Sequence, residues 1–288
     1  MNLIKVFFEM RQKFLTVIVS FGVGYALICG FMFLAQERLT FMPELAALHG
    51  PQVFPEAHFT EISLTTKDGT TLHGIRTAPL KEAPYVVYFG GNAQNIINFG
   101  QFLRRALPDV NLVAFNYRGY GKSEGEPTKK HLMRDVNAKA LWIRDNLPPR
   151  PIYSLGLSIG TGPATKYAQL VNAEGLMLIM PYDNLAKVGA DAYPWLPVRA
   201  LFRHNIRTDE YMEKYSGPVA MLVAADDNLI HPARSRALSR HAENLLMYDE
   251  VPGQNHNSLI NSDILMNWLP NALTNLEHAQ VKQPRQSP

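Results

Sequence analysis

The segment Gly-Leu-Ser-Ile-Gly has the residue types and spacing of a serine nucleophile on a tight turn, with Gly156, Ser158 and Gly160 at its fixed positions. The apolar run 151–155 before it predicts a short buried strand, and residues 161–168 predict the start of a helix. G-x-S-x-G at such a junction is typical of a nucleophile elbow, which holds the serine hydroxyl above a sheet. Glycine is expected on both sides because the turn leaves no room for a larger side chain. An ordinary strand–turn–helix connection is the alternative interpretation.

A serine hydroxyl is a weak nucleophile at neutral pH and needs a general base, which a carboxylate must orient. In chains that carry this elbow, the acid and then the histidine follow the serine. His256 comes after the last predicted strand and before a helix, and it is the predicted base. Asp227 closely follows the predicted strand 219–223 and is the preferred acid, with the neighbouring Asp226 as the alternative. Either carboxylate could instead cap the helix that begins near Pro232.

The chain has nine histidines. Only His256 combines the expected order with a position between a strand and a helix, and a solvated loop histidine is the alternative interpretation of it. His231 lies just after the acidic turn and is interpreted as a surface residue. His73 and His204 are interpreted as structural residues.

Acyl transfer also requires hydrogen-bond donors for the oxyanion that develops on the substrate. Residues 90–93 read Gly-Gly-Asn-Ala and directly follow the apolar run 85–89. Paired glycines allow the backbone to approach a substrate closely. The predicted donors are the backbone N–H groups of Asn92 and of Ile159, the residue after the nucleophile. A plain glycine-rich loop is the alternative, and the pattern of a phosphate-binding loop, G-x-x-x-x-G-K-[ST], does not match.

A second glycine-rich segment, residues 116–127, also follows a predicted strand. We interpret it as a structural turn that at most lines the site, and we assign Arg118 no catalytic role.

Strands and helices alternate from residue 58 onward. Two strands, 59–65 and 70–76, are joined by a hairpin turn at residues 67–69. Further strands are predicted at residues 85–89, 111–115, 151–155, 175–180, 219–223 and 245–248, and helices at residues 96–107, 129–146, 232–242 and 258–276. This alternation predicts an α/β protein with a mostly parallel central sheet and helices on both faces.

The N-terminal part of the chain has the composition of a membrane span. Residues Phe14 to Leu34 carry no charge, and these 21 residues would form a helix about 31 Å long, close to the thickness of a bilayer's hydrocarbon core. This length and the lack of a convincing cleavage site favour an uncleaved signal anchor, a transmembrane helix, over a cleaved signal peptide.

The charges around this segment predict its orientation. Lys5, Arg11 and Lys13 precede it, whereas Arg38 is the only Lys or Arg that closely follows. The excess of positive charge predicts a cytoplasmic N-terminus and an exported catalytic domain, on the periplasmic or extracytoplasmic side. Within the segment, three small residues recur every four positions and could pack weakly against a second copy of the helix. They are Gly22, Ala26 and Gly30.

Composition excludes several classes of function. The apolar fraction is 47 %, the charged fraction is 18 % and the net charge is +3, without long runs of Lys or Arg. The sequence therefore gives no indication of nucleic-acid binding. Its single cysteine, Cys29, precludes an intrachain disulfide, and no zinc-ligand spacing is present. We predict no metal and no cofactor.

Together these elements resemble the α/β-hydrolase superfamily from about His58 to Leu276. More narrowly, the anchor and the Gly-Asn-Ala turn resemble a membrane-anchored branch called serine aminopeptidase-like or palmitoyl-protein-thioesterase-like. That branch usually has His-Gly-Asn-Ala at the oxyanion turn, and Gly90 replaces the histidine here. The resemblance implies a hydrolase of esters, thioesters or amides in which Ser158 attacks a carbonyl and His256 transfers the proton. Relatives with an Asp nucleophile are disfavoured because the elbow residue is Ser.

The predicted organisation is an anchor (1–35), a connector (36–57), a catalytic domain (58–278) and a disordered tail (279–288), with a lid insertion at about 181–217. The lid is rich in apolar and aromatic residues, which favours an esterase or thioesterase for a lipid-like or acyl-bearing small molecule. The alternative interpretation is that these apolar residues only pack the lid onto the core. An aminopeptidase is the second prediction, because five acidic residues of the lid could bind a peptide amino terminus. They are Asp183, Asp191, Asp209, Glu210 and Glu213. A non-catalytic binding protein of this fold is the alternative from another class.

Overall fold

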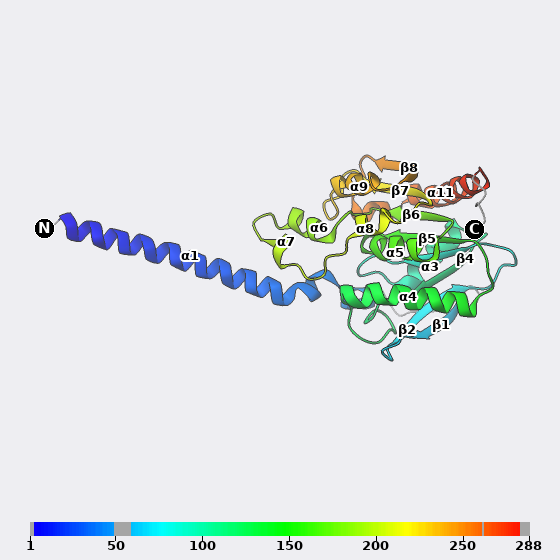
Figure 1. The fold of residues 1–288 in the computed structure, drawn as a ribbon, viewed down its shortest axis with the longest axis horizontal. Helices are drawn as coiled ribbons and strands as arrows, with labels where there is room; N and C mark the ends of the chain where they lie inside the picture. Colours follow the sequence, from blue (N-terminus) through cyan, green and yellow to red (C-terminus); the bar gives the residue numbers. More distant parts are fainter. Residues whose placement is uncertain (1–2, 49–58, 261, 283–288) are drawn as a thin grey trace.

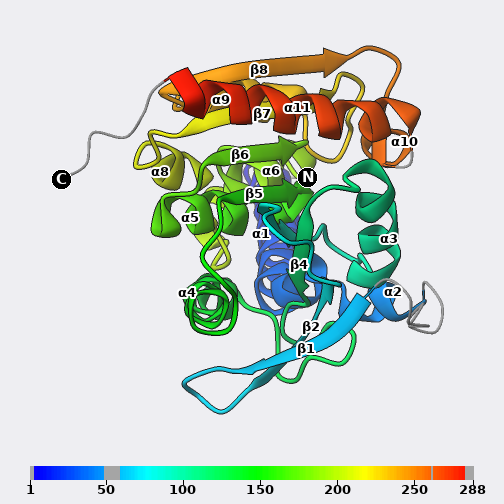
Figure 2. The same ribbon diagram turned by 90° about the vertical axis from the view of Figure 1, so that its right-hand side faces the viewer.

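The fold is built on an eight-stranded sheet with the strand order β1-β2-β4-β3-β5-β6-β7-β8. The structure is a computed structural model, and it describes residues 3–48, 59–260 and 262–282. The strands are β1 (Phe59–Thr65), β2 (Thr71–Thr77), β3 (Tyr85–Phe89), β4 (Asn111–Phe115), β5 (Ile152–Leu157), β6 (Gly175–Ile179), β7 (Pro218–Ala224) and β8 (Asn244–Val251). Figure 2 shows the sheet from β1 and β2 at one edge to β8 at the other.

The sheet is mostly parallel. β1 pairs antiparallel with β2, and β2 pairs antiparallel with β4, whereas every pair from β4 to β8 is parallel. Every residue of β3, β4, β6 and β7 is buried, which is why these strands read as continuous apolar runs rather than alternating ones. The parallel pairing brings the carboxyl ends of β3, β5, β7 and β8 to one edge of the sheet.

Helices cover both faces of the sheet, as Figure 2 shows. The helices of this part of the chain are α3 (Ile96–Ala106), α4 (Lys129–Asn146), α5 (Thr161–Val171), α9 (Pro232–Ser239), α10 (His256–Ile260) and α11 (Asp263–Lys282). Residues of α3 and α11 form one hydrophobic core with the sheet, and residues of α4, α5 and α9 form the core on the opposite face. The predicted fold class is confirmed.

The segment between β6 and β7 forms the predicted insertion, and we call residues 181–217 the lid segment. It contains three short helices, α6 (Leu185–Ala192), α7 (Val198–Leu201) and α8 (Thr208–Met212). Figure 1 shows α6 and α7 on the side of the sheet from which the N-terminal helix extends.

The N-terminal helix α1 (Leu3–Thr40) extends away from the rest of the molecule as a long rod (Figure 1). It is long and apolar enough to cross a membrane, and its most apolar part is exposed. A short helix, α2 (Pro43–Leu48), follows it. Residues 36–40, which begin the predicted connector, continue α1, and Gln36 is buried against the lid segment. The rest of the predicted connector, residues 49–57, lies outside the described residues.

The C-terminal boundaries also differ from prediction. The single helix expected at residues 258–276 is two helices, α10 and α11, with residue 261 outside the described residues. α11 continues to Lys282, so the predicted disordered tail is wrong for residues 279–282. Residues 283–288 lie outside the described residues. Gln280 explains part of this extension, since its side chain donates a hydrogen bond to the backbone carbonyl of Glu174 at 2.7 Å.

Candidate active site

Ser158 lies immediately after β5, on the turn that leads into α5. Its φ of 53° is a left-handed conformation that residues other than glycine rarely adopt, and such strain is common at functional sites. A Cβ on Gly160 would lie 2.2 Å from the backbone oxygen of Phe89. A Cβ on Gly156 would lie 2.7 Å from the Cβ of Ala164. No larger residue fits at either position, so the local geometry matches that expected of a nucleophile elbow.

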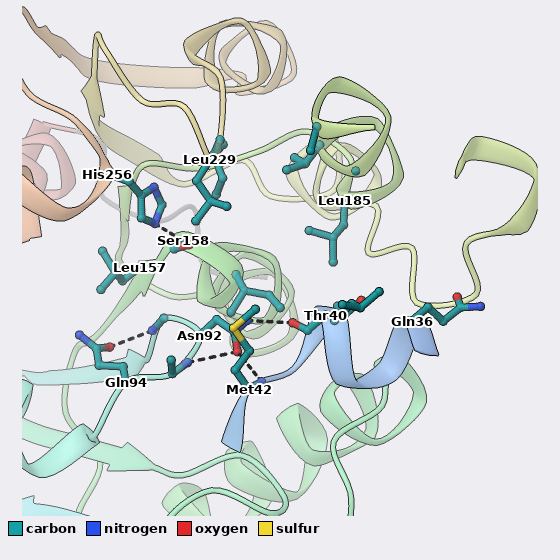
Figure 3. Close-up of a pocket in the computed structure, with 18 of the residues that line it drawn as sticks. Gln36, Thr40, Met42, Asn92, Gln94, Leu157, Ser158, Leu185, Leu229 and His256 are labelled. Carbon is teal, nitrogen blue, oxygen red and sulfur yellow. Dashed lines mark hydrogen bonds between the residues drawn. The ribbon is translucent and has the colours of Figure 1, made fainter. Parts of the chain in front are cut away.

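A chain of hydrogen bonds joins Ser158, His256 and Asp227. Nε2 of His256 lies 3.1 Å from Oγ of Ser158 (Figure 3). Nδ1 of His256 lies 2.6 Å from Oδ2 of Asp227. All three are buried, with 5 %, 9 % and 2 % of their surfaces exposed, in that order. The other carboxylate oxygen of Asp227 accepts the backbone N–H groups of Leu229 and Ile230, both at 2.8 Å. These bonds hold Oδ2 toward the imidazole, and a proton on Nδ1 would leave Nε2 free to accept one from the serine.

These three residues follow three different strands. Ser158 follows β5, Asp227 follows β7 and His256 follows β8 as the first residue of α10. Because the strands are parallel, their carboxyl ends meet at one edge of the sheet, where open α/β proteins bind their ligands. Residues 98 positions apart in the chain, Ser158 and His256, are thereby brought into hydrogen-bond contact.

The neighbouring candidates lie elsewhere. Asp226 is exposed, and its backbone N–H donates to the carbonyl of Gln254. His231 is also exposed and caps α9, where Nδ1 accepts the N–H of Ala233 at 3.2 Å. The structure therefore places Asp227, and not Asp226, against His256, and it places His231 on the surface as expected.

The loop after β3 lies beside Ser158. Asn92 and Ile159, the residues whose backbone N–H groups are the predicted oxyanion donors, line the same cavity as Ser158. Among the residues that the structure describes, no hydrogen-bond acceptor is present for the N–H of Asn92. The neighbouring N–H of Gly91 is already bonded to the side chain of Gln94 at 2.8 Å.

Tyrosine and glutamine side chains support this loop. The hydroxyl of Tyr117 donates to the backbone oxygen of Gly90 at 2.8 Å. Burial raises the pKa of Tyr117 well above its ordinary value, which keeps this hydroxyl protonated. The hydroxyl of Tyr88 donates to the Gln94 side chain, which also accepts the N–H of Gly91. Sequence reasoning missed these supports, although Gln94 lies only two residues after Asn92.

The side chain of Asn92 connects the loop to the end of α1 (Figure 3). Nδ2 donates to the backbone oxygen of Thr40 at 2.9 Å, and Oδ1 accepts the N–H of Met42 at 3.0 Å. Oδ1 also accepts the hydroxyl of Tyr120 at 2.6 Å. Sequence reasoning did not identify this connection, because nothing in the local pattern relates residues 50 positions apart.

A cavity of about 940 Å³ opens beside Ser158. Its lining is mainly apolar and comes from α1, the loop after β3, the lid segment and the loops that carry Asp227 and His256. Figure 3 shows Leu185 and Leu229 on the same side of the cavity as His256, with Thr40 and Met42 across from them. The volume is at the upper end of the range for small-molecule sites.

Arg118, His73 and His204 have structural contacts. Nε of Arg118 donates to Asp135 at 2.9 Å within a buried ion pair. His73 and His204 are buried, and burial lowers the pKa of each imidazole. These contacts agree with the structural interpretation of all three residues.

Comparison with known proteins places the fold in context. Residues 84–207 match the family model described as alpha/beta hydrolase fold. The chain is 27 % identical to an uncharacterized protein of Mycobacterium tuberculosis (strain ATCC 25618 / H37Rv), over 92 % of this chain and 96 % of the relative. It is also 27 % identical to lysophosphatidylserine lipase ABHD12 of Danio rerio, over 66 % of this chain and 58 % of the relative.

Solved structures of esterases share the fold. The esterase Pf2001 of Pyrococcus furiosus has a TM-score of 0.63 and 20 % identity, covering 77 % of this chain and 91 % of that one. Est1E from Butyrivibrio proteoclasticus has a TM-score of 0.59 and 16 % identity, covering 76 % and 99 %. The family model, the lipase and esterase relatives and the sheet topology agree, and the chain has the α/β-hydrolase fold.

Proposed function

We propose that this protein is a membrane-anchored serine hydrolase that cleaves a carboxylic ester or thioester of a lipid-like acyl substrate. The observation that carries the proposal is the hydrogen-bonded chain Ser158–His256–Asp227 beside a large, mainly apolar cavity. An alkyl chain can be buried in such a cavity, which leaves its carbonyl carbon beside the Ser158 hydroxyl.

The proposed reaction has two halves. Oγ of Ser158 attacks the substrate carbonyl while Nε2 of His256 accepts the hydroxyl proton, and Asp227 stabilises the imidazolium. The backbone N–H groups of Asn92 and Ile159 hold the oxyanion. His256 then protonates the departing alcohol or thiol, which leaves an acyl-enzyme. In the second half, His256 accepts a proton from water, the hydroxide attacks the acyl group, and Ser158 regains its proton as the carboxylic acid departs.

The alternative of an aminopeptidase has less support. A peptide amino terminus needs a carboxylate that is free to bind it, but each acidic residue of the lid segment already has a basic side chain as its partner. Asp183 bonds Lys187, Asp191 lies near Arg234, Asp209 and Glu210 lie near Arg207, and Glu213 contacts His241. None of the five lines the cavity. The name of the Danio rerio relative, a lysophosphatidylserine lipase, also favours a lipid-like substrate.

We further propose that α1 spans the membrane with its N-terminus in the cytoplasm. Its length and exposed apolar surface support the span, and the excess of Lys and Arg before residue 14 supports the direction. The catalytic domain would then be exported.

The test is hydrolysis of a p-nitrophenyl ester series by the full-length protein in phospholipid vesicles, beside Ser158→Ala. We expect turnover by the wild type and a loss of several orders of magnitude in the variant. A fluorophosphonate probe should label the wild type and not Ser158→Ala. Folded wild-type protein that neither reacts with the probe nor cleaves any ester would be a binding protein, and preference for aminoacyl amides over esters would instead indicate the aminopeptidase.

A further inference from the structure

One face of the anchor helix forms a wall of the catalytic cavity. The lining residues of α1 are Cys29, Met32, Phe33, Gln36, Leu39 and Thr40. Position 29, the pair 32 and 33, position 36 and the pair 39 and 40 follow one another at intervals of three or four residues, which places them along one side of a helix. Ser158 and His256 line the same cavity from the sheet. The helix therefore contributes to the binding site as well as attaching it.

Hydrogen bonds hold this face of α1 against the lid segment. The hydroxyl of Tyr25 donates to the backbone oxygen of Trp195 at 2.9 Å. The side-chain oxygen of Gln36 accepts the N–H of Arg203 at 2.7 Å. The guanidinium of Arg203 lies 4.6 Å from the ring centre of Phe33. The lid segment thus lies along α1 from Tyr25 to Gln36. This stretch of helix is about 16 Å long, at a rise of about 1.5 Å per residue.

Most of this contact lies within the predicted membrane span. The uncharged stretch ends at Leu34, nine residues after Tyr25, which corresponds to about 14 Å along the helix. The tip of the lid segment would then reach into one leaflet of a bilayer whose hydrocarbon core is about 30 Å thick. At this tip Tyr193 is 43 % exposed and Trp195 is 55 % exposed, so the lid segment presents large aromatic side chains to its surroundings.

We propose that the cavity admits the acyl chain of a membrane lipid ester directly from the bilayer, between α1 and the lid segment. The inference rests on the proposed function, because it specifies where the acyl chain of that substrate lies and from where it arrives. The chain passes along Met32 and Phe33, and the carbonyl reaches Ser158. The lipid never has to leave the apolar phase, which avoids the free-energy cost of exposing its methylene groups to water.

The first test narrows the cavity by enlarging the side chain at position 32. Met32→Trp places a larger side chain in the predicted path, and Phe31→Trp is the matched control, since Phe31 is 68 % exposed and does not line the cavity. Full-length proteins in phospholipid vesicles are compared on p-nitrophenyl palmitate and p-nitrophenyl butyrate. We expect the palmitate-to-butyrate ratio of kcat/KM to fall at least tenfold in Met32→Trp and to stay at the wild-type value in Phe31→Trp.

The outcomes separate this inference from the proposed function. If Met32→Trp still reacts with fluorophosphonate but its palmitate-to-butyrate ratio is unchanged, the inference is overturned and the proposed hydrolase activity stands. A wild type that cleaves neither ester and does not react with the probe would contradict the proposed function itself.

The second test needs no turnover. Vesicles that contain phospholipid brominated on the acyl chains quench tryptophan only at bilayer depth. We expect quenching of the wild type and a clear loss of the quenched component in Trp195→Phe. Equal quenching of both proteins would show that Trp195 lies outside the bilayer and would overturn entry of the lipid at this place.

Discussion

The side-chain amide of Asn92 donates a 2.9 Å hydrogen bond to the backbone carbonyl of Thr40, and so joins the proposed oxyanion loop to the last residue of α1. The loop also has a left-handed residue, Ala93, with φ of 57°. A strained loop retains its shape only where its surroundings hold it. The contact with Thr40 is one of the restraints that do so.

Asn92→Asp is expected to lower kcat by roughly tenfold or more, because a carboxylate oxygen cannot donate to Thr40 and the loop loses this restraint. The effect should appear in kcat per phosphonate-labelled site, with little change in KM. A residue that only stabilises the fold would change the number of labelled sites instead. Asn137→Asp, on the exposed surface of α4, is the matched control and should leave kcat unchanged.

Substitutions of the two adjacent aspartates should have very different effects on kcat. Asp227→Asn removes the carboxylate that faces Nδ1 of His256, and we expect a loss of about 10⁴ in kcat, the scale seen when the acid of such a triad becomes an amide. Asp226→Asn should retain wild-type activity because its side chain is exposed and away from the imidazole. Ester hydrolysis by the two variants is the measurement. Equal losses in both would contradict the assignment.

Gly160→Ala is expected to abolish phosphonate labelling. The new Cβ would lie 2.2 Å from the backbone oxygen of Phe89 and 2.5 Å from that of Gly90, which forces the elbow and the loop after β3 apart. Overpacking of this kind costs about 1–3 kcal/mol in stability. Gly24→Ala has no atom within 4 Å of its new Cβ and serves as the control. Wild-type labelling by Gly160→Ala would refute the steric argument.

The buried lysine of α4 should make stability depend on pH. Burial lowers the pKa of Lys139 to about 8 from its usual 10.5. Between these values the unfolded chain binds more protons than the folded one, so the free energy of unfolding rises with pH across this window. Lys139→Met removes the cost of burying the charge, on the order of 3 kcal/mol below pH 8.

Thermal unfolding followed by circular dichroism at pH 7 and pH 10 tests this expectation. The variant should have the higher Tm at pH 7, and the difference from the wild type should shrink at pH 10. A difference that is the same at both pH values would exclude titration of Lys139 as its cause.

The proposed orientation predicts that a C-terminal tag is exported. In spheroplasts or sealed vesicles of known sidedness, protease added from the extracytoplasmic side should remove the tag without breaking the membrane. Protection of the tag until detergent is added would reverse the orientation, because the prediction depends on the positive charges of residues 5–13.

The positions of the candidate site residues were predictable from sequence because each element that carries one has a local signal. Gly156 and Gly160 mark a turn, and Asp227 and His256 each follow a predicted strand in the expected order. The parallel arrangement of the strands is enough to bring these strand ends to one edge of the sheet, so no additional sequence signal is needed to predict that they meet.

The cavity wall was not predictable in the same way. The pairing of Asn92 with Thr40, and of Tyr25 with Trp195, joins segments 52 and 170 positions apart. Composition predicts that α1 is apolar, which suits lipid and protein equally well, so its cavity-lining face cannot be distinguished from the rest. Gln36 shows the same limit, since its polarity suggested a connector although it is buried against the lid segment.

Because α1 continues without interruption from the proposed membrane span into the cavity wall, the proposed reaction would take place in two dimensions, within the plane of the membrane. The quantity that governs its rate is then the number of substrate molecules per unit area of membrane, and not their molar concentration in the surrounding solution. Inert phospholipid added at constant total substrate would lower the surface density of substrate. The rate of hydrolysis would then fall, as it would for any catalyst confined to a surface.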